Sequence, residues 1–154
     1  MKSLVVFYSR TGTTKKVAES IAKKLEADIE EIVDLTDRKG ALGFILGGRD
    51  ALRKKPTEIK KPEKNPADYD LVVIGTPVWA STMAPAIRVY FSTAKIKSSA
   101  FFCTYGGRGA EKTFADMLEL LLHTKLVGKL GLSTKEVNLG AEEKISKFIE
   151  IIKK

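Results

Sequence analysis

The stretch from Lys2 to Thr14 constrains the fold more than any other part of the chain. Leu4–Phe7 is a short, continuously apolar run, which is typical of a parallel strand buried on both faces. Hydroxyl residues around a single glycine follow at Ser9–Thr14, and apolar residues then recur at helical spacing from Val17. In this order of strand, loop and helix, the unpaired N–H groups of the first helical turn point at the loop. We therefore predict an anion site there.

The loop differs from two well-known phosphate-binding motifs. A Walker A motif ends in Gly-Lys-Ser/Thr, whereas Gly12 is followed by Thr-Thr-Lys, and the dinucleotide fingerprint needs three glycines. Hydroxyl donors from Ser9, Thr11 and Thr14 would nevertheless suit a phosphate, and Gly12 allows the backbone to approach closely. The alternative is a helix N-cap that simply has surplus Ser and Thr residues.

Strand patterns and helix patterns alternate five times along the chain. Beyond the first strand we expect strands at Ile29–Leu35, Asp70–Gly75 and Ser99–Thr104, and a last one within Leu126–Val137. This alternation predicts a three-layer, doubly wound α/β fold with a five-stranded parallel sheet. Apolar faces predict helices over Thr13–Glu26, from Pro85, around Phe114–Leu122 and around Ile145–Ile152.

Residues 36–66 are the least regular part of the chain. Glycines and prolines punctuate the segment, while Phe44–Leu46 and Ala51–Leu52 could pack one short helix. We interpret it as a connection lying over the sheet, because it is too small for a core of its own. The 154 residues are accordingly expected to form a single domain, 1–154.

The sequence also indicates in which cellular compartment the protein is expected. The apolar runs are too short to span a bilayer, and the N-terminus shows no signal peptide. The one cysteine, Cys103, leaves no internal disulfide, which fits a reducing environment. We expect a cytoplasmic protein.

The formal net charge of +8 is unevenly distributed. Residues 37–64 carry nine Lys or Arg and four Asp or Glu, so 9 − 4 = +5 of the excess lies there. Phe44 is the only aromatic in this segment, so it lacks the aromatic interleaving that stacks nucleotides. We expect no nucleic acid and no membrane insertion, and a monomer or weak dimer. The segment either docks an acidic redox partner protein or is a solvated lysine-rich surface.

Three motifs resemble one known family in the expected order. Ser9-x-Thr11-Gly12-x-Thr14 resembles the FMN-phosphate loop of the flavodoxin family, and Gly75–Ser81 and Thr104–Gly109 resemble its two later loops. The resemblance covers essentially the whole chain. It implies strand order 2-1-3-4-5, with FMN bound at the carboxyl edge where that order reverses. Too little sequence separates Leu126 from Val137 for the insertion of long-chain members, so the chain looks like a short-chain member.

The resemblance implies that all three loops contact FMN. The implied cofactor-binding residues are Ser9, Arg10, Thr11, Gly12, Thr13 and Thr14, then Thr76, Pro77, Val78, Trp79, Ala80 and Ser81, then Thr104, Tyr105, Gly106, Gly107 and Gly109.

Two aromatic residues in these loops have alternative roles. Trp79, the only tryptophan, is expected in a loop, where it either stacks on the flavin or plugs the top of the core. Ala80 and Ser81 would then lie beside the reactive N5 edge of the flavin. Tyr105 could supply a second stacking aromatic, although many relatives place their tyrosine further from the strand.

No catalytic residue or metal site is predicted from side chains. No His, Cys or carboxylate cluster has ligand spacing, and Cys103, within an apolar strand, is expected to be inert. Any chemistry therefore belongs to a cofactor. We expect an FMN-binding electron carrier, a flavodoxin that shuttles electrons between redox partners without substrate turnover of its own. The alternatives are an FMN-dependent NAD(P)H:quinone reductase or related flavin reductase, and a flavin-free binding module.

Overall fold

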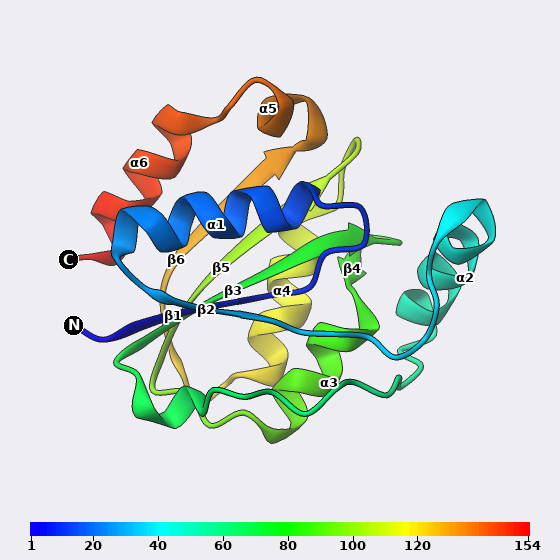
Figure 1. Cartoon of the computed structure of the whole chain (residues 1–154), viewed down its shortest axis with the longest axis horizontal. Coiled ribbons are helices and arrows are strands. Elements are labelled where there is room, and N and C mark those ends of the chain that lie inside the picture. Colours follow the sequence, from blue (N-terminus) through cyan, green and yellow to red (C-terminus); the bar gives the residue numbers. More distant parts are fainter.

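One twisted sheet organises the computed structural model, which describes residues 1–154 (Figure 1). Its parallel strands lie in the spatial order β2 (Asp28–Glu31), β1 (Ser3–Phe7), β3 (Leu71–Trp79), β5 (Ser98–Tyr105) and β6 (Lys125–Ser133). A further strand of two residues, β4 (Thr82–Met83), pairs antiparallel with β3. The α/β class and the parallel sheet are confirmed, but the expectation of five strands was wrong by one. A two-residue strand has too few residues to show an alternating pattern.

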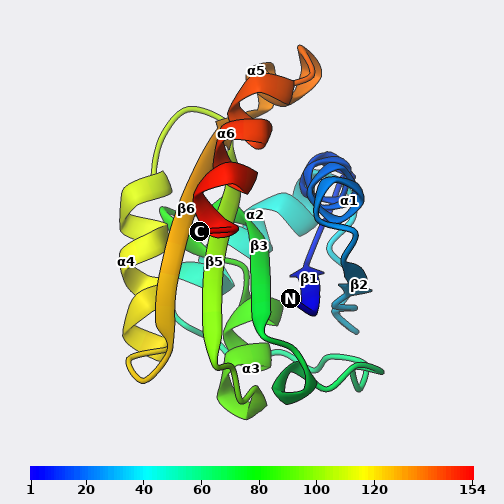
Figure 2. The same ribbon diagram turned by 90° about the vertical axis from the view of Figure 1, so that its left-hand side faces the viewer.

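Helices cover both faces of this sheet (Figure 2). On one face lie α1 (Thr13–Leu25), α5 (Thr134–Asn138) and α6 (Glu142–Ile152), and on the other lie α3 (Pro85–Thr93) and α4 (Ala110–Leu120). A 3-10 turn, η1 (Pro66–Asp68), precedes β3. No helix of the structure combines the length and the apolar character needed to cross a bilayer.

The central strands are buried on both faces, as the apolar run at the N-terminus predicts. Side chains alternate between two cores: Val5 and Val73 pack toward α1 and α6, while Val6 and Val72 pack toward α3 and α4. All four are fully buried.

Strand boundaries differ from the expected ones where tertiary contacts decide them. β3 continues past Gly75 to Trp79, because Thr76 and Pro77 pair with β5 and Trp79 pairs with β4. β2 ends at Glu31, and Asp34 forms only an isolated antiparallel bridge with Ile59. The short helix α5, which begins with a capping box at Ser133, was not anticipated.

The irregular segment contains a longer helix than expected, α2 (Gly40–Leu52). Figure 1 shows α2 beyond the carboxyl ends of the strands, outside the two helical layers. Gly43 and Gly47 do not interrupt this helix; they let it lie close to its neighbours. A Cβ on Gly43 would come within 2.1 Å of the Arg38 carbonyl carbon, and one on Gly47 within 3.0 Å of the Trp79 ring.

Candidate functional site

The loop between β1 and α1 presents unpaired backbone donors. Gly12 precedes the helix in the left-handed region, with φ of 99°, and as a glycine it has no side chain that could cap α1. The Ser9 hydroxyl oxygen accepts hydrogen bonds from the N–H groups of Gly12 at 3.1 Å and Lys15 at 3.2 Å. The N–H groups of Thr13 and Thr14 have no acceptor within the chain. This donor set fits a phosphate, which accepts hydrogen bonds and is favoured by the helix dipole.

The second predicted loop is mostly strand. Residues 76–79 complete β3, so the expectation that Trp79 lies in a loop is wrong. The Thr76 hydroxyl donates to the Pro77 carbonyl at 2.9 Å and accepts from the Ala84 N–H at 3.0 Å, which fixes the end of the strand. The true turn is the pair Ala80–Ser81, which connects β3 to β4.

That turn holds two consecutive non-glycine residues in the left-handed region. Ala80 has φ of 50° and Ser81 has φ of 61°. Positive φ at both central residues is the geometry of a type I′ hairpin turn, which strongly favours Asn-Gly. Side chains with a Cβ are disfavoured there, and such strain gathers at functional sites. The turn's backbone is thus held by its surroundings rather than by its own preference.

Trp79 lies in the core beneath α2. Its exposed fraction is 8%, and its ring meets the Tyr8 ring edge-on with centroids 5.4 Å apart. Gly47 of α2 lies against one part of the indole, and the Arg38 guanidinium carbon is 5.7 Å from the ring centroid. This placement matches the alternative in which the indole closes the top of the core. Stacking of the indole on a flavin remains a prediction.

The third loop is joined to both of the others. The hydroxyl oxygens of Thr14 and Thr104 are 2.8 Å apart and buried, which ties the start of α1 to the end of β5. Gly109 has φ of 105°, and a Cβ there would lie 2.9 Å from Val78 Cγ1 and 3.0 Å from Ser81 Cα. The three stretches predicted from sequence therefore meet at one edge of the sheet.

Two parts of the third loop remain available to a ligand. Nothing lies within 4 Å of a Cβ built on Gly106 or Gly107, so their backbone is open. Tyr105 instead packs toward β6, with its Cε1 atom 3.5 Å from a Cβ built on Gly131. Its role as a second stacking aromatic stays a prediction.

A buried ion-pair cluster beside this edge was not predicted from the sequence. Arg38 Nε lies 2.7 Å from Asp34 Oδ2 and Arg38 Nη1 lies 3.1 Å from Asp50 Oδ2, and at most 9% of any of these three side chains is exposed. Asp34 also accepts from the Thr57 hydroxyl at 2.8 Å. The four-residue spacing of Asp34 and Arg38 was a visible signal, but Asp50 and Thr57 join only through the fold. The cluster fastens α2 to the segment after β2.

Burial and charge act against each other in this cluster. Burial opposes the charge of Arg38, but hydrogen bonds to Asp34 and Asp50 outweigh it and raise the pKa of the guanidinium. Burial would likewise raise the pKa of the Asp50 carboxyl, but the hydrogen bond from Arg38 and nearby cations lower it. Both groups are therefore charged at neutral pH.

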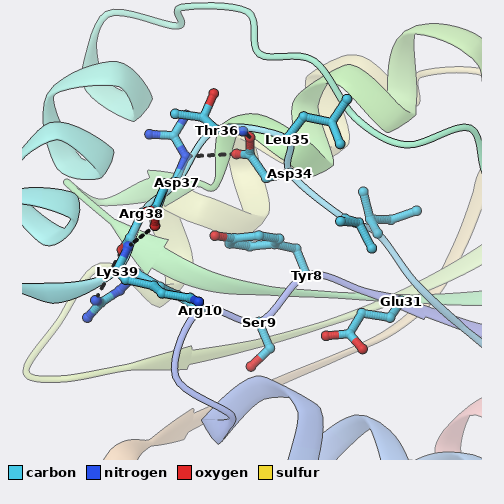
Figure 3. A pocket seen from close by; sticks show the side chains of 12 residues that line it. Tyr8, Ser9, Arg10, Glu31, Asp34, Leu35, Thr36, Asp37, Arg38 and Lys39 are labelled. Carbon is cyan, nitrogen blue, oxygen red and sulfur yellow. Dashed lines mark hydrogen bonds and ion pairs between the residues drawn. The ribbon is translucent and has the colours of Figure 1, made fainter.

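A cavity of about 350 Å³ lies between the end of β1 and residues 31–39 (Figure 3). Tyr8 lines it, and burial, together with the charge of Asp34, raises the pKa of the phenol to about 12. Arg10 also lines it, with Nη1 3.5 Å from the Arg38 carbonyl oxygen and its guanidinium 5.4 Å from the Phe44 ring. Arg10 thus contacts the basic segment rather than the open backbone at Thr13.

Known proteins share this sequence pattern and fold. The family model described as flavodoxin matches residues 2–135. An NAD(P)H dehydrogenase (quinone) from Deinococcus radiodurans is 31% identical over 123 residues, which are 76% of this chain. They span only 58% of the length of that relative.

Solved structures agree with the fold. A protein from Bacteroides uniformis superimposes with a TM-score of 0.80 at 19% identity, over 97% of each chain. A flavoprotein from Lactobacillus acidophilus, crystallised in complex with FMN, gives a TM-score of 0.72 at 23% identity, over 91% of this chain and 98% of its own.

The strained turn generates one prediction. Ala80→Gly should leave the free energy of unfolding unchanged or raise it, because relief of about 1–2 kcal/mol of left-handed strain offsets the flexibility of glycine. The matched control, Ala115→Gly at an exposed position of α4, should lose about 1 kcal/mol. Urea denaturation measures both, and equal losses would show that the turn is unstrained.

The ion-pair cluster of Arg38, Asp34 and Asp50 generates a second prediction. Arg38→Met removes the cation shared by two buried carboxylates, leaving Asp50 with the longer contact to Arg49 and Asp34 with only hydroxyl and backbone donors. It should lower the free energy of unfolding by about 3–5 kcal/mol at neutral pH. Because the pKa of Asp50 is lowered on folding, its contribution is present at neutral pH and lost as the pH falls through the carboxyl range. The difference in the free energy of unfolding between wild type and Arg38→Met should therefore become smaller at acidic pH.

The matched control is Lys147→Met, which removes an exposed pair with Glu143. It should leave the unfolding midpoint almost unchanged. A loss in the free energy of unfolding for Arg38→Met that does not change with pH would contradict the assigned ion pairs.

Proposed function

Because this chain belongs to the flavodoxin family, we propose that it binds FMN non-covalently at the carboxyl edge of the sheet and carries electrons between redox partners. One observation carries the proposal: the N–H groups of Thr13 and Thr14 at the start of α1 are unpaired beside a hydroxyl-rich loop. A phosphate monoester would satisfy those donors. Bound FMN would supply the redox chemistry that the protein's own side chains lack.

The proposed cofactor contacts follow from the three loops. Ser9–Thr14 would hold the phosphate, and the open backbone of Gly106 and Gly107 would face the polar edge of the flavin. The Ala80–Ser81 turn would place its peptide groups beside the flavin's reactive edge.

The one cysteine is poorly placed for thiol chemistry. Cys103 is fully buried in β5, and burial raises the pKa of its thiol to about 12. No cluster of His, Cys, Asp or Glu in the structure could hold a metal ion.

A reductase is the second candidate function. It is supported by the similarity to an enzyme named NAD(P)H dehydrogenase (quinone), although this chain spans 58% of that enzyme's length. In this alternative the chain would accept electrons from a nicotinamide nucleotide and pass them to a quinone or related acceptor. Carrier and reductase differ in whether the nucleotide alone reduces the flavin.

The basic segment, residues 37–64, is the proposed docking surface for an acidic redox partner. Most of its cations are exposed, among them Lys39, Arg53, Lys54 and Lys55. Arg38 is the exception, because it is buried and paired with Asp34 and Asp50. The segment lies next to the proposed flavin edge, so a partner docked there would be close to the cofactor.

Removing one exposed hydroxyl tests the phosphate site. Thr11→Ala should bind FMN at least about tenfold more weakly, since a hydrogen bond to a charged group contributes roughly 1.5–3 kcal/mol. Ser92→Ala removes an exposed hydroxyl at the end of α3 and should bind normally. Quenching of FMN fluorescence measures both affinities. Equal affinities would place the phosphate elsewhere.

Anaerobic mixing separates the two functions. As a carrier, the FMN-loaded chain should keep its oxidised visible spectrum in excess NADH or NADPH, and dithionite should bleach it at once. Rapid bleaching by either nucleotide would favour the reductase.

Salt tests the docking surface. Association with the natural acidic partner should slow as ionic strength rises, because exposed charges are screened beyond about 8–10 Å at physiological salt. Lys60→Glu/Lys61→Glu should slow it further at low salt. Lys147→Glu/Lys153→Glu, with the same charge change outside the segment, should have a smaller effect. If the association rate changes neither with salt nor in Lys60→Glu/Lys61→Glu, the segment is a solvated surface and not a docking site.

A further inference from the structure

Helix α2 turns its large apolar side chains toward the outside of the molecule. Its inward face carries Gly43, Gly47, Asp50 and Ala51, which are small or already paired. Its outward face carries large apolar side chains that are 62–68% exposed, namely Leu42, Phe44, Ile45 and Leu52. A helix packed only to close a core would place these residues inside. An exposed apolar patch of this kind marks a binding surface.

Part of this outward face forms one wall of a pocket. The pocket has a volume of about 460 Å³ and lies between α2 and the end of β3. Its lining residues are Phe44, Ile45, Gly48, Arg49 and Leu52 from α2, Arg53 at the C-cap of that helix, and Val78, Trp79 and Ala80 from β3 and its turn. Both its size and its mainly apolar lining are those of a small-molecule site.

Two guanidinium groups give the pocket its charge. Arg49 and Arg53 are one helical turn apart, so they lie on the same side of α2 and repel each other. Arg49 Nη2 reaches the Asp50 carboxylate only at 3.5 Å, and Arg53 is exposed without an ion pair. No carboxylate lines the pocket. An anionic group would relieve the repulsion and match the planar fork of a guanidinium.

We propose that this pocket binds a small planar aromatic molecule that carries a negative charge. The ring system would lie against Phe44, Ile45 and Leu52, and the anionic group would meet Arg49 and Arg53. Ala80 belongs both to this pocket and to the turn beside the proposed flavin edge. Whether the ligand exchanges electrons with FMN therefore rests on the proposed function, whereas its binding does not.

Titration calorimetry with naphthalene sulfonate tests the proposal, with uncharged naphthol as the matched probe. Both titrations are run on the protein as purified and again after saturation with FMN. The sulfonate should bind one per chain in both states, and naphthol should bind about threefold to tenfold more weakly, as expected for contacts to partly exposed cations.

Four variants locate the site. Arg53→Gln should weaken the sulfonate about threefold to tenfold but leave naphthol unchanged, and Leu52→Ser should weaken both probes. Lys60→Gln removes a charge from the same basic segment outside the pocket, and Leu42→Ser removes an exposed leucine of α2 that does not line it. Neither control should change the binding of either probe.

Several results would overturn the proposal. If Lys60→Gln lowers the affinity for the sulfonate as much as Arg53→Gln does, the attraction to the basic segment is non-specific. If the sulfonate and naphthol bind equally well, the pocket does not recognise an anionic group. Displacement of the sulfonate by FMN would assign the pocket to the flavin itself. A dimer in sedimentation that both Leu42→Ser and Leu52→Ser dissociate would make this face a contact between two copies. Failure to bind FMN, with sulfonate binding intact, would contradict only the proposed function.

Discussion

A buried hydrogen bond between two hydroxyls, those of Thr14 and Thr104, holds the candidate site together. The two residues are 90 positions apart in sequence, yet their oxygens lie 2.8 Å from each other. The parallel sheet makes this possible, because the carboxyl ends of β1 and β5 reach the same edge. Since neither side chain is accessible, water cannot replace the bond, and breaking it would leave buried polar groups unpaired. The start of α1 is thereby fixed relative to the third loop.

The second constraint is the Arg38 cluster, which holds α2 beyond that edge. A buried ion pair is costly to desolvate, so its net contribution to stability is small, but its removal from one side is severely destabilising. Here it joins three separated stretches, at Asp34, Asp50 and Thr57. The same helix covers Trp79 and presents an apolar, arginine-bearing face outward. One cluster thus determines both how the core is closed and what the surface beside the site offers.

The parts of the fold that local patterns control were predictable. Continuous apolar runs such as Leu4–Phe7 imply strands buried on both faces, and the pattern from Val17 onward implies α1. The family resemblance rested on glycine and hydroxyl positions that the structure brings to one edge. Those short motifs survive as sequence signals because each lies directly after a strand.

The remainder depended on partners distant in sequence. Trp79 was expected in a loop, but pairing with β4 and contact with Gly47 place it in a strand and under a helix. The glycines of α2 suggested interruptions, whereas they permit close packing. Arg10 was assigned to the phosphate loop from its position, and its contacts with Arg38 and Phe44 required the fold. No local pattern contains such contacts.

The most direct test compares FMN with riboflavin, which lacks the phosphate, in titrations of the flavin-free protein. If the N-terminus of α1 holds a phosphate, FMN should bind at about one per chain and riboflavin at least about tenfold more weakly. Equal affinities for the two flavins, or no binding of FMN, would contradict the account.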